Sequence, residues 1–409
     1  MSTNPQFAAG LQSAQSLTQI PLRSSRPGDE KYDIIIAGGG LAGLSLATHL
    51  INSPLRDRTI LIIDRAAKDR DDRTWSFWTD RPTLFDSIVD RSWDQLRLAN
   101  DHFEQIIDLH HYRYKTIRSI DFYQYARQQL TARPNVTFAQ GVVEQIEDDA
   151  DAVRATVDGQ TIWGQWAFDS TFTRAEVKPD AHYHHLKMHF RGWEIETSQP
   201  QFDPRSATFL DFRTPQQGSM RFFYVLPFSE QRALVEYTLF STTALHHDEY
   251  ALALTAYLQN KWGLADYHIA HEEGGVIPIT DQPYPRRMGQ HVMTIGTKAG
   301  RIKPTTGFAF MRIQDDSAAI VQSLVKHDQP FDVPPDSRRY RRYDALLLEI
   351  MERHGEEIKS IFTTLFRRNP IERVLRFLDE VGSPRENLQL IATLPPWRFL
   401  QAMVQLAVR

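Results

Sequence analysis

The chain has 409 residues, of which 41% are hydrophobic and 24% charged, and its net charge is -4 at pH 7. This length can bury a large core in two or more units, while the small charge gives no general electrostatic case for nucleic-acid binding. The absence of cysteine excludes disulfides, thiolate nucleophiles, iron–sulfur clusters and thiolate zinc sites.

Residues 1–30 are rich in Ser, Gln, Pro and Arg and lack the apolar core of a signal peptide. We expect them to form a flexible leader. The next stretch, YDIIIAGGGLAGLSLATHL at 32–50, is apolar enough to suggest a membrane span. Asp33 and four glycines within it oppose that interpretation, and a nucleotide site explains them better.

This stretch begins as a buried strand, breaks at glycines and continues as a helix. Gly38, Gly40 and Gly43 have the G-x-G-x-x-G spacing. The first glycine allows a tight turn, the second lets a pyrophosphate approach the backbone, and the third permits close packing of helix on strand. A second strand, TILIID, ends at Asp64, where an acid that binds ribose is expected. We therefore predict a dinucleotide site at the N-terminus of this helix.

A second glycine-rich segment, VMTIGTKAGRIKPTTGFAF, occurs late in the chain. We interpret it as a strand over 292–295, a loop containing Gly296 and Gly300, and a helix that begins near Thr306 and Gly307. The N-terminus of such a helix could hold the electron-rich end of a flavin, although an ordinary strand-to-helix loop has the same pattern. The chain has only one dinucleotide fingerprint, at the start of its folded part, and a second glycine-rich segment late in the sequence. Together these favour a flavoprotein in which two distant segments bind one FAD.

The stretch RALVEYTLFS at 232–241 places one glutamate, Glu236, inside a hydrophobic strand. Alternation puts Glu236 on one face of that strand and Tyr237 on the other. A half-polar face exposed to solvent explains the pattern on its own. A catalytic carboxyl held against apolar side chains is the alternative, and it needs support from elsewhere in the chain.

Two motifs carry a resemblance to a known family. DDRTWSFW at 71–78 is a charged loop that runs into Trp75, Phe77 and Trp78, a spacing that by itself is typical of a core. As a string, however, it resembles a signature of the lycopene cyclases of carotenoid biosynthesis. LVEYT at 234–238 is similar to the acidic motif of that family, with tyrosine at its second, commonly acidic position. That replacement opposes a paired-carboxylate mechanism.

Two later stretches, GGVIPIT at 274–280 and GTKAGRIKPTTGFAF at 296–310, resemble segments of the same family that precede and form its late flavin-binding region. Phe308 stands where that family usually has tyrosine. The resemblance extends from about residue 32 to near residue 400.

The resemblance implies an α/β fold with a doubly wound, Rossmann-like FAD-binding domain of flavin-hydroxylase type, an antiparallel substrate-binding sheet and a helical C-terminal part. The expected divisions are the leader at 1–30, the FAD-binding domain at 31–175 and 274–335, the substrate-binding sheet at 176–273, and the C-terminal helices at 336–409.

The implied activity is that of a lycopene β-cyclase, an isomerase or intramolecular lyase that closes the linear ends of lycopene into β-rings, giving β-carotene by way of γ-carotene. Burial would raise the pKa of Glu236 and make it the catalytic group, either as the proton donor or as a stabiliser of the carbocation. Reduced FAD would stabilise the carbocation without net redox, with NAD(P)H as electron donor. The resemblance further implies that Arg73 binds the cofactor and that Trp75, Phe77, Trp78 and Tyr237 contact the substrate.

The substrate class implies contact with a membrane, and no uninterrupted apolar run of spanning length occurs. Basic pairs alternate with apolar positions in 337–409, as in helices that lie in a membrane interface, although helices packed on a core show the same pattern. We expect a cytoplasmic, peripherally membrane-associated protein without nucleic acid or an identifiable protein partner. The histidine clusters lack H-E-x-x-H spacing, so no metal site is expected.

Two alternatives remain open from the sequence. The first is a flavin-dependent oxidoreductase, such as a hydroxylase or polyprenyl reductase, acting on an isoprenoid; it would consume NAD(P)H stoichiometrically. The second is a non-catalytic protein that binds flavin or lipid, in which replacing Glu236 would have no effect.

Overall fold

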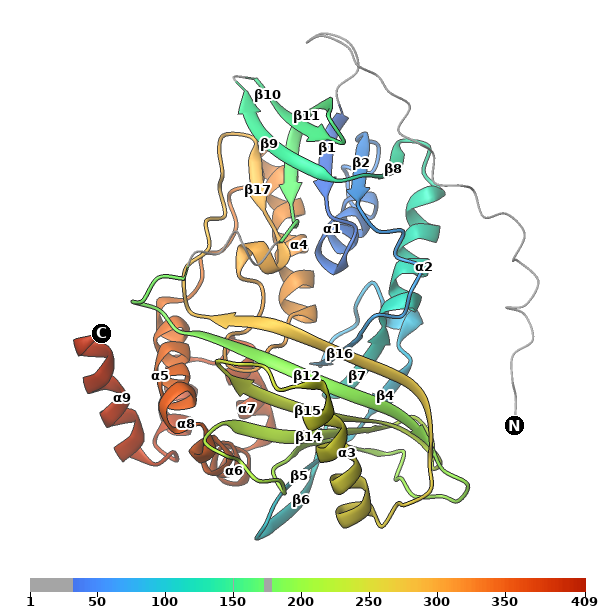
Figure 1. The fold of residues 1–409 in the computed structure, drawn as a ribbon. Helices are drawn as coiled ribbons and strands as arrows, with labels where there is room; N and C mark the ends of the chain where they lie inside the picture. The colour runs from blue at the N-terminus through green and yellow to red at the C-terminus, as the bar shows by residue number, and fades with distance from the viewer. Residues whose placement is uncertain (1–31, 150, 173–178) are drawn as a thin grey trace.

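A computed structural model describes residues 32–149, 151–172 and 179–409 (Figure 1). The predicted leader, 1–30, lies outside these ranges. Within them the chain forms two seven-stranded sheets, a three-stranded sheet and a helical C-terminal part. The predicted α/β architecture is confirmed.

The first sheet is the doubly wound one, and its strand order is β8-β2-β1-β11, with β17 beside the second half of β11. Neighbouring strands in this part run parallel. Helices pack on the face of Ile34 and Ile36, and the antiparallel strands that extend the sheet pack on the face of Ile35. All three residues are therefore buried, which explains the unbroken apolar run of the sequence. β9 and β10 extend the sheet as an antiparallel pair. Its elements are β1 (Tyr32–Ala37), α1 (Leu41–Ile51), β2 (Ile60–Asp64), α2 (Ser119–Thr131), β8 (Val136–Gln140), β9 (Val143–Asp149), β10 (Ala152–Val157), β11 (Gln160–Asp169), β17 (Val292–Thr294) and α4 (Phe310–His327).

The second sheet has the order β16-β12-β15-β14-β13-β5-β6 and is antiparallel except where β13 pairs with β5. One face is covered by α3, and the other faces a large apolar core shared with the C-terminal helices (Figure 1). Its elements are β5 (Gln95–Asn100), β6 (Phe103–Asp108), β12 (His185–Glu196), β13 (Ser206–Asp211), β14 (Met220–Pro227), β15 (Arg232–Ser241), α3 (His247–Trp262) and β16 (His268–Thr280).

The domain divisions expected from the sequence do not follow these sheets at two places. β5 and β6 lie within 31–175, yet they pair with the second sheet, because the edge of β13 accepts β5 in parallel. β16 runs unbroken across the division at 273/274 and pairs with β12 along its length.

A small sheet of β3 (Thr74–Thr79), β4 (Arg91–Trp93) and β7 (Arg113–Arg118) contributes side chains to the cores of both large sheets. A short 3-10 turn, η2 (Asp86–Ile88), precedes β4. The C-terminal helices lie beside the second sheet (Figure 1). They are α5 (Arg338–His354), α6 (Ile358–Arg368), α7 (Ile371–Leu378), α8 (Pro384–Ile391) and α9 (Pro396–Val408), with a 3-10 turn, η5 (Gly355–Glu357), between α5 and α6.

The late helix begins later than predicted. The sequence pattern placed its start near Thr306 and Gly307, but α4 starts at Phe310. Gly307 has a φ of +77°, in the left-handed region, and cannot belong to the first turn of a right-handed helix. Its N–H donates to the carbonyl of Lys303, so residues 303–308 form a closed turn before the helix.

Candidate active site

The glycine-rich turn joins β1 to α1 as its spacing predicts. Gly38 has a φ of +101°, which only glycine adopts readily. A Cβ on Gly43 would lie 1.9 Å from the carbonyl oxygen of Gly38, so only glycine lets α1 approach the turn this closely. An added Cβ on Gly40, the N-cap of α1, would meet nothing within 4 Å. The turn is therefore tightly packed at Gly43 and open at Gly40.

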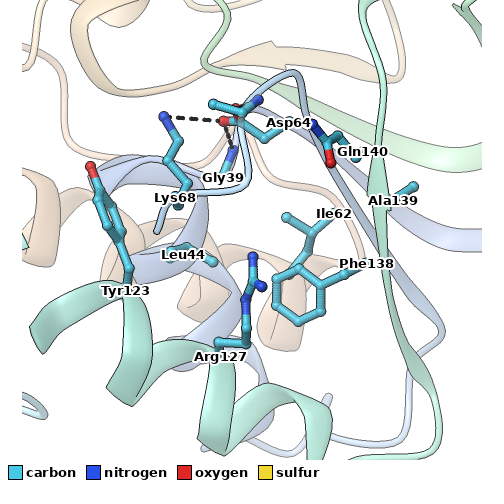
Figure 2. A pocket seen from close by; sticks show the side chains of 11 residues that line it. Gly39, Leu44, Ile62, Asp64, Lys68, Tyr123, Arg127, Phe138, Ala139 and Gln140 are labelled. Atoms are coloured by element: carbon cyan, nitrogen blue, oxygen red, sulfur yellow. Dashed lines mark hydrogen bonds and ion pairs between the residues drawn. The ribbon is translucent and has the colours of Figure 1, made fainter. Parts of the chain in front are cut away.

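Asp64, at the end of β2, lies against this turn. Its Oδ2 accepts a hydrogen bond from the N–H of Gly39 at 2.7 Å and lies 3.5 Å from Nζ of Lys68 (Figure 2). A cavity opens beside these groups, between the ends of β2 and β8 and the helix α2 (Figure 2). Tyr123 and Arg127 of α2 line it. The predicted acid thus lies beside the glycine turn, at the edge of a cavity.

The late glycine-rich segment packs directly on the first one. The N–H of Ile295 donates to the carbonyl of Asp169, which continues the pairing of β17 with β11. A Cβ on Gly296, which begins the 3-10 turn η4 (Gly296–Ala299), would come within 2.6 Å of the Cβ of Ala42 in α1. Gly300 closes η4 with a φ of +67°. The two distant segments therefore meet at the start of α1.

The same segment ends at the second sheet. A Cβ on Gly307 would lie 2.1 Å from Sδ of Met188 in β12, so the late segment and β12 are in contact there. Lys303 is buried and binds the carboxylates of Asp344 and Glu380, which anchor the loop to α5 and to the turn after α7. Thr306 lies within this anchored turn and lines a small cavity beside Trp78.

The aromatic motif forms β3, whose alternation sends its side chains to two different places. Trp75 and Phe77 face the first core, where Phe77 stacks on Phe310 with ring centroids 4.2 Å apart. Trp78 faces the second core, contacts Phe308 edge-on at 4.6 Å and donates from Nε1 to Asp379 at 2.7 Å. The structure brings Trp78 to the second sheet and leaves Trp75 and Phe77 in the first core.

Arg73, just before β3, is bound by its neighbour. Its Nη2 lies 2.8 Å from Oδ2 of Asp72, and its side chain is more than half exposed. Asp72 also accepts a hydrogen bond from the hydroxyl of Tyr123, a residue of the cavity beside Asp64. Arg73 thus lies between that cavity and the acidic strand β16.

Glu236 lies in the middle of β15, on the face that points into the second core. Its side chain is buried, and Thr238 donates from Oγ1 to its Oε1 at 2.6 Å. It stands opposite Tyr224 of β14 on one side and Gly192 of β12 on the other. Tyr114 is fully buried nearby. Burial first, and then the charge of Glu273, raise the pKa of Glu236 well above its usual range.

Glu273 is a second buried carboxyl at this place, and the sequence patterns did not identify it. It lies on β16, opposite Gly192 on the far side of β12, and its side chain is in hydrogen-bond contact with that of Glu236. Thr74 donates from Oγ1 to Oε2 of Glu273 at 2.8 Å. Burial raises its pKa, and the hydroxyl of Thr74 opposes that shift. Its position directly before the GGVIPIT motif could have marked it as a candidate site residue. Its contact with Glu236, however, becomes apparent only from the pairing of β15, β12 and β16.

Tyr237 does not join this group. It points to the opposite face of β15, where it stacks on Phe223 with ring centroids 4.6 Å apart, beneath α3. It lines a different cavity, between the second sheet and α3. The pleat of the strand separates it from Glu236, so the structure gives no support to its expected contact with the substrate bound at that acid.

One of the histidine clusters contributes to a buried ionic group. Nδ1 and Nε2 of His184 lie 3.0 and 2.8 Å from carboxylate oxygens of Asp281 and Glu349. Arg353 and Arg409 also bind Glu349, and Arg409 binds Glu352. Glu349 and Glu352 thus have cationic side-chain partners.

The model of the family described as lycopene cyclase protein matches residues 33–404. The chain belongs to the lycopene cyclase family. It is 29% identical over 305 residues to the lycopene beta-cyclase of a Paracoccus species, covering 68% of this chain and 70% of that protein. It is 27% identical over 285 residues to the lycopene beta-cyclase of Pantoea ananas, covering 68% and 71%.

Plant members of the family are longer. The chain is 25% identical over 318 residues to the chloroplastic lycopene beta cyclase of Solanum lycopersicum, with 72% of this chain and 60% of that protein covered. The chain thus spans less than two thirds of this plant relative.

Solved structures similar in fold include a flavoprotein/dehydrogenase and a halogenase. A flavoprotein/dehydrogenase from Cytophaga hutchinsonii has a TM-score of 0.61 at 12% identity, covering 85% of this chain and 92% of that one. A halogenase variant solved in complex with FAD has a TM-score of 0.60 at 13% identity, covering 89% and 90%. These likenesses confirm the predicted fold of flavin-hydroxylase type.

Proposed function

We propose that this protein is a lycopene β-cyclase in which Glu236 is the catalytic acid. The observation that carries the proposal is a carboxyl with a raised pKa, buried on the apolar face of the second sheet. Cyclisation of a polyene end begins when a proton adds to the terminal alkene. Because an alkene is a poor base, the acid must stay protonated near neutral pH and must be shielded from water.

The reaction needs no net exchange of atoms or electrons. The O–H bond of the acid breaks as a C–H bond forms, the resulting cation is captured by the next double bond, and a C–H bond of the new ring then breaks to return the proton. Tyr114 and Tyr224 are buried around Glu236, and Trp78 lies in the same core. Their ring faces can stabilise a developing cation and exclude water.

The glycine cradle fits FAD. The open backbone at Gly40 leaves room for a pyrophosphate at the N-terminus of α1, and Asp64 lies where a ribose hydroxyl would bind. Gly296, Gly300, Thr306 and Gly307 would complete the site from the late segment, with Arg73 at its edge. When bound in its reduced form, with NAD(P)H as electron donor, FAD would supply negative charge beside the developing cation.

The surface of α8 and α9 suits a substrate that resides in membranes. The side chains of Trp397, Leu400, Val404 and Val408 recur along α9 and are exposed. Leu388 of α8 is exposed as well. Within the described residues, every helix is too short or too polar to cross a bilayer. We propose that this apolar stripe lies in the membrane interface and that lycopene is taken up there.

The test is an anaerobic assay with FAD, NADPH and lycopene in liposomes, with pigments separated by chromatography and detected by mass. Cyclisation gives products of unchanged mass that absorb at shorter wavelength, because the double bond left in each new ring is twisted out of the plane of the polyene and conjugates poorly with it. Glu236→Gln should lower this activity at least about 100-fold, the scale of a lost general acid. Stoichiometric NADPH consumption with a product of changed mass would instead identify a redox enzyme.

A further inference from the structure

The two buried glutamates reach each other because the residue between them is glycine. Glu236 on β15 and Glu273 on β16 flank Gly192 of β12, so their backbones are about 9.6 Å apart, two strand spacings. A Cβ on Gly192 would lie 3.3 Å from Cγ of Glu273 and 3.4 Å from Cβ of Glu236. The space above Gly192 is therefore taken by the side chains of the two glutamates together with Leu234, whose Cδ1 would lie 3.0 Å from the same Cβ.

The surroundings of the two carboxyls differ in a way that decides which one keeps a proton. Glu236 is enclosed by Tyr114 and Tyr224, two buried neutral phenols, with Thr238 as its hydroxyl donor. Burial and the charge of Glu273 raise its pKa, and the hydroxyl of Thr238 opposes that shift. Its environment favours the neutral acid.

Glu273 also accepts a hydroxyl hydrogen bond, as Glu236 does, but it differs from Glu236 in having positive charges nearby. Thr74 donates a hydrogen bond to it, and the positive charge of Arg118 favours its ionised form. The charge of Arg73 also acts on it. Asp71 and Glu194 lie nearby and oppose this, but Arg118 binds Asp71 and Arg232 binds Glu194. Of the two carboxyls, Glu273 is the better placed to carry the negative charge.

We propose that Glu273 shares one proton with Glu236 and, as a positioning residue, holds the negative charge that keeps Glu236 in its protonated, proton-donating form. This rests on the proposed cyclase function. When Glu236 gives its proton to the alkene, both carboxyls are briefly ionised beside the cation. The proton lost from the ring then returns to the pair, which restores its starting state. Two like charges in one buried site cannot be kept ionised without cost, which drives this return.

The deciding measurement is the pH profile of cyclisation in Glu273→Gln. Activity requires a protonated Glu236 and is lost as pH rises through its raised pKa. Without the negative charge of Glu273 that pKa falls, so the alkaline limb should move down by about one pH unit or more. Glu272→Gln is the matched control, because Glu272 is adjacent, exposed and bound to Arg191 on the other face of β16. A uniform loss of rate without a shift of the profile would overturn the proposal.

Thr74→Val provides a test of opposite sign. It removes the hydroxyl that favours ionised Glu273, so the pair should hold its proton to higher pH and the alkaline limb should move up. A shift in the same direction as that of Glu273→Gln would contradict proton sharing.

Infrared titration of the carboxylic C=O stretch gives a readout that needs neither flavin nor turnover. The component of this band that belongs to Glu236 should persist above neutral pH in the unmodified protein and titrate at lower pH in Glu273→Gln. In Glu236→Gln only the components of other buried carboxyls, such as Asp379, should remain. An active Glu236→Gln variant would reject the proposed catalytic acid. An inactive Glu236→Gln together with an unshifted Glu273→Gln would reject only the pair.

Discussion

Alanine at Gly43 and alanine at Gly40 should damage the protein in two different ways. At Gly43 the new Cβ would lie 1.9 Å from the carbonyl oxygen of Gly38, whereas ordinary contact begins at 3.4 Å, so α1 must move by about 1.5 Å. Overpacking of this kind costs about 1–3 kcal/mol of the free energy of unfolding. At Gly40 φ is -87° and the space is open, so the same free energy should change by less than about 1 kcal/mol.

The effects on flavin binding should rank the other way: Gly40→Ala, which hardly changes stability, should weaken FAD binding directly. A Cβ at Gly40 stands where the pyrophosphate would approach the backbone, so Gly40→Ala should fold normally and bind FAD at least about tenfold more weakly, or 1.4 kcal/mol. Thermal unfolding of the apoprotein and a fluorescence titration with FAD measure the two effects separately. A Gly40→Ala protein that binds FAD as tightly as the unmodified protein would refute the placement of the phosphates. A fully stable Gly43→Ala protein would refute the steric reasoning.

Two further predictions concern stability and membrane binding. Burial raises the pKa of Asp379 to about 7, so its ionisation destabilises the fold as pH rises from about 4 to 7. The free energy of unfolding of Asp379→Asn should therefore exceed that of the unmodified protein by up to about 4 kcal/mol above pH 7 and should equal it below pH 4. Parallel stability–pH curves for the two proteins would contradict this. The double variant Trp397→Ser, Val404→Ser should bind lipid vesicles about tenfold more weakly than the unmodified protein in a flotation assay. The control Leu252→Ser, at an equally exposed position on α3, should bind normally. Equal binding by the double variant, the control and the unmodified protein would contradict a membrane contact through α9.

The cofactor cradle could be predicted from the sequence because its geometry is local. The tight turn at Gly38, the close packing at Gly43 and the position of Asp64 all follow from a strand, a turn and a helix that are consecutive in the chain. The start of α4 was predicted too early because a glycine in the pattern was taken for a helix start. In the structure Gly307 has a positive φ and ends a turn instead.

The acid site could be predicted only in part. Alternation along β15 already puts Glu236 and Tyr237 on opposite faces, and this pleat outweighs the motif position that suggested a role for Tyr237 beside the acid. Glu273 was missed because its contact depends on the register of β16 against β12, which shifts between Glu194 and Ile195. A single sequence carries no direct signal for such a register.

The late segment explains how a cofactor cradle and an acid pair on separate sheets can act on one substrate. It leaves the cradle at Gly296, against α1, and reaches the second sheet at Gly307, against Met188. Met188 and Gly192 lie on the same face of β12, four residues or about 13 Å apart along the strand. One short stretch of chain, anchored through Lys303 to the buried carboxylate of Asp344 and the partly buried one of Glu380, therefore connects both sites. Since the middle of this stretch is anchored in this way, the stretch fixes the separation between the glycine turn and the second sheet.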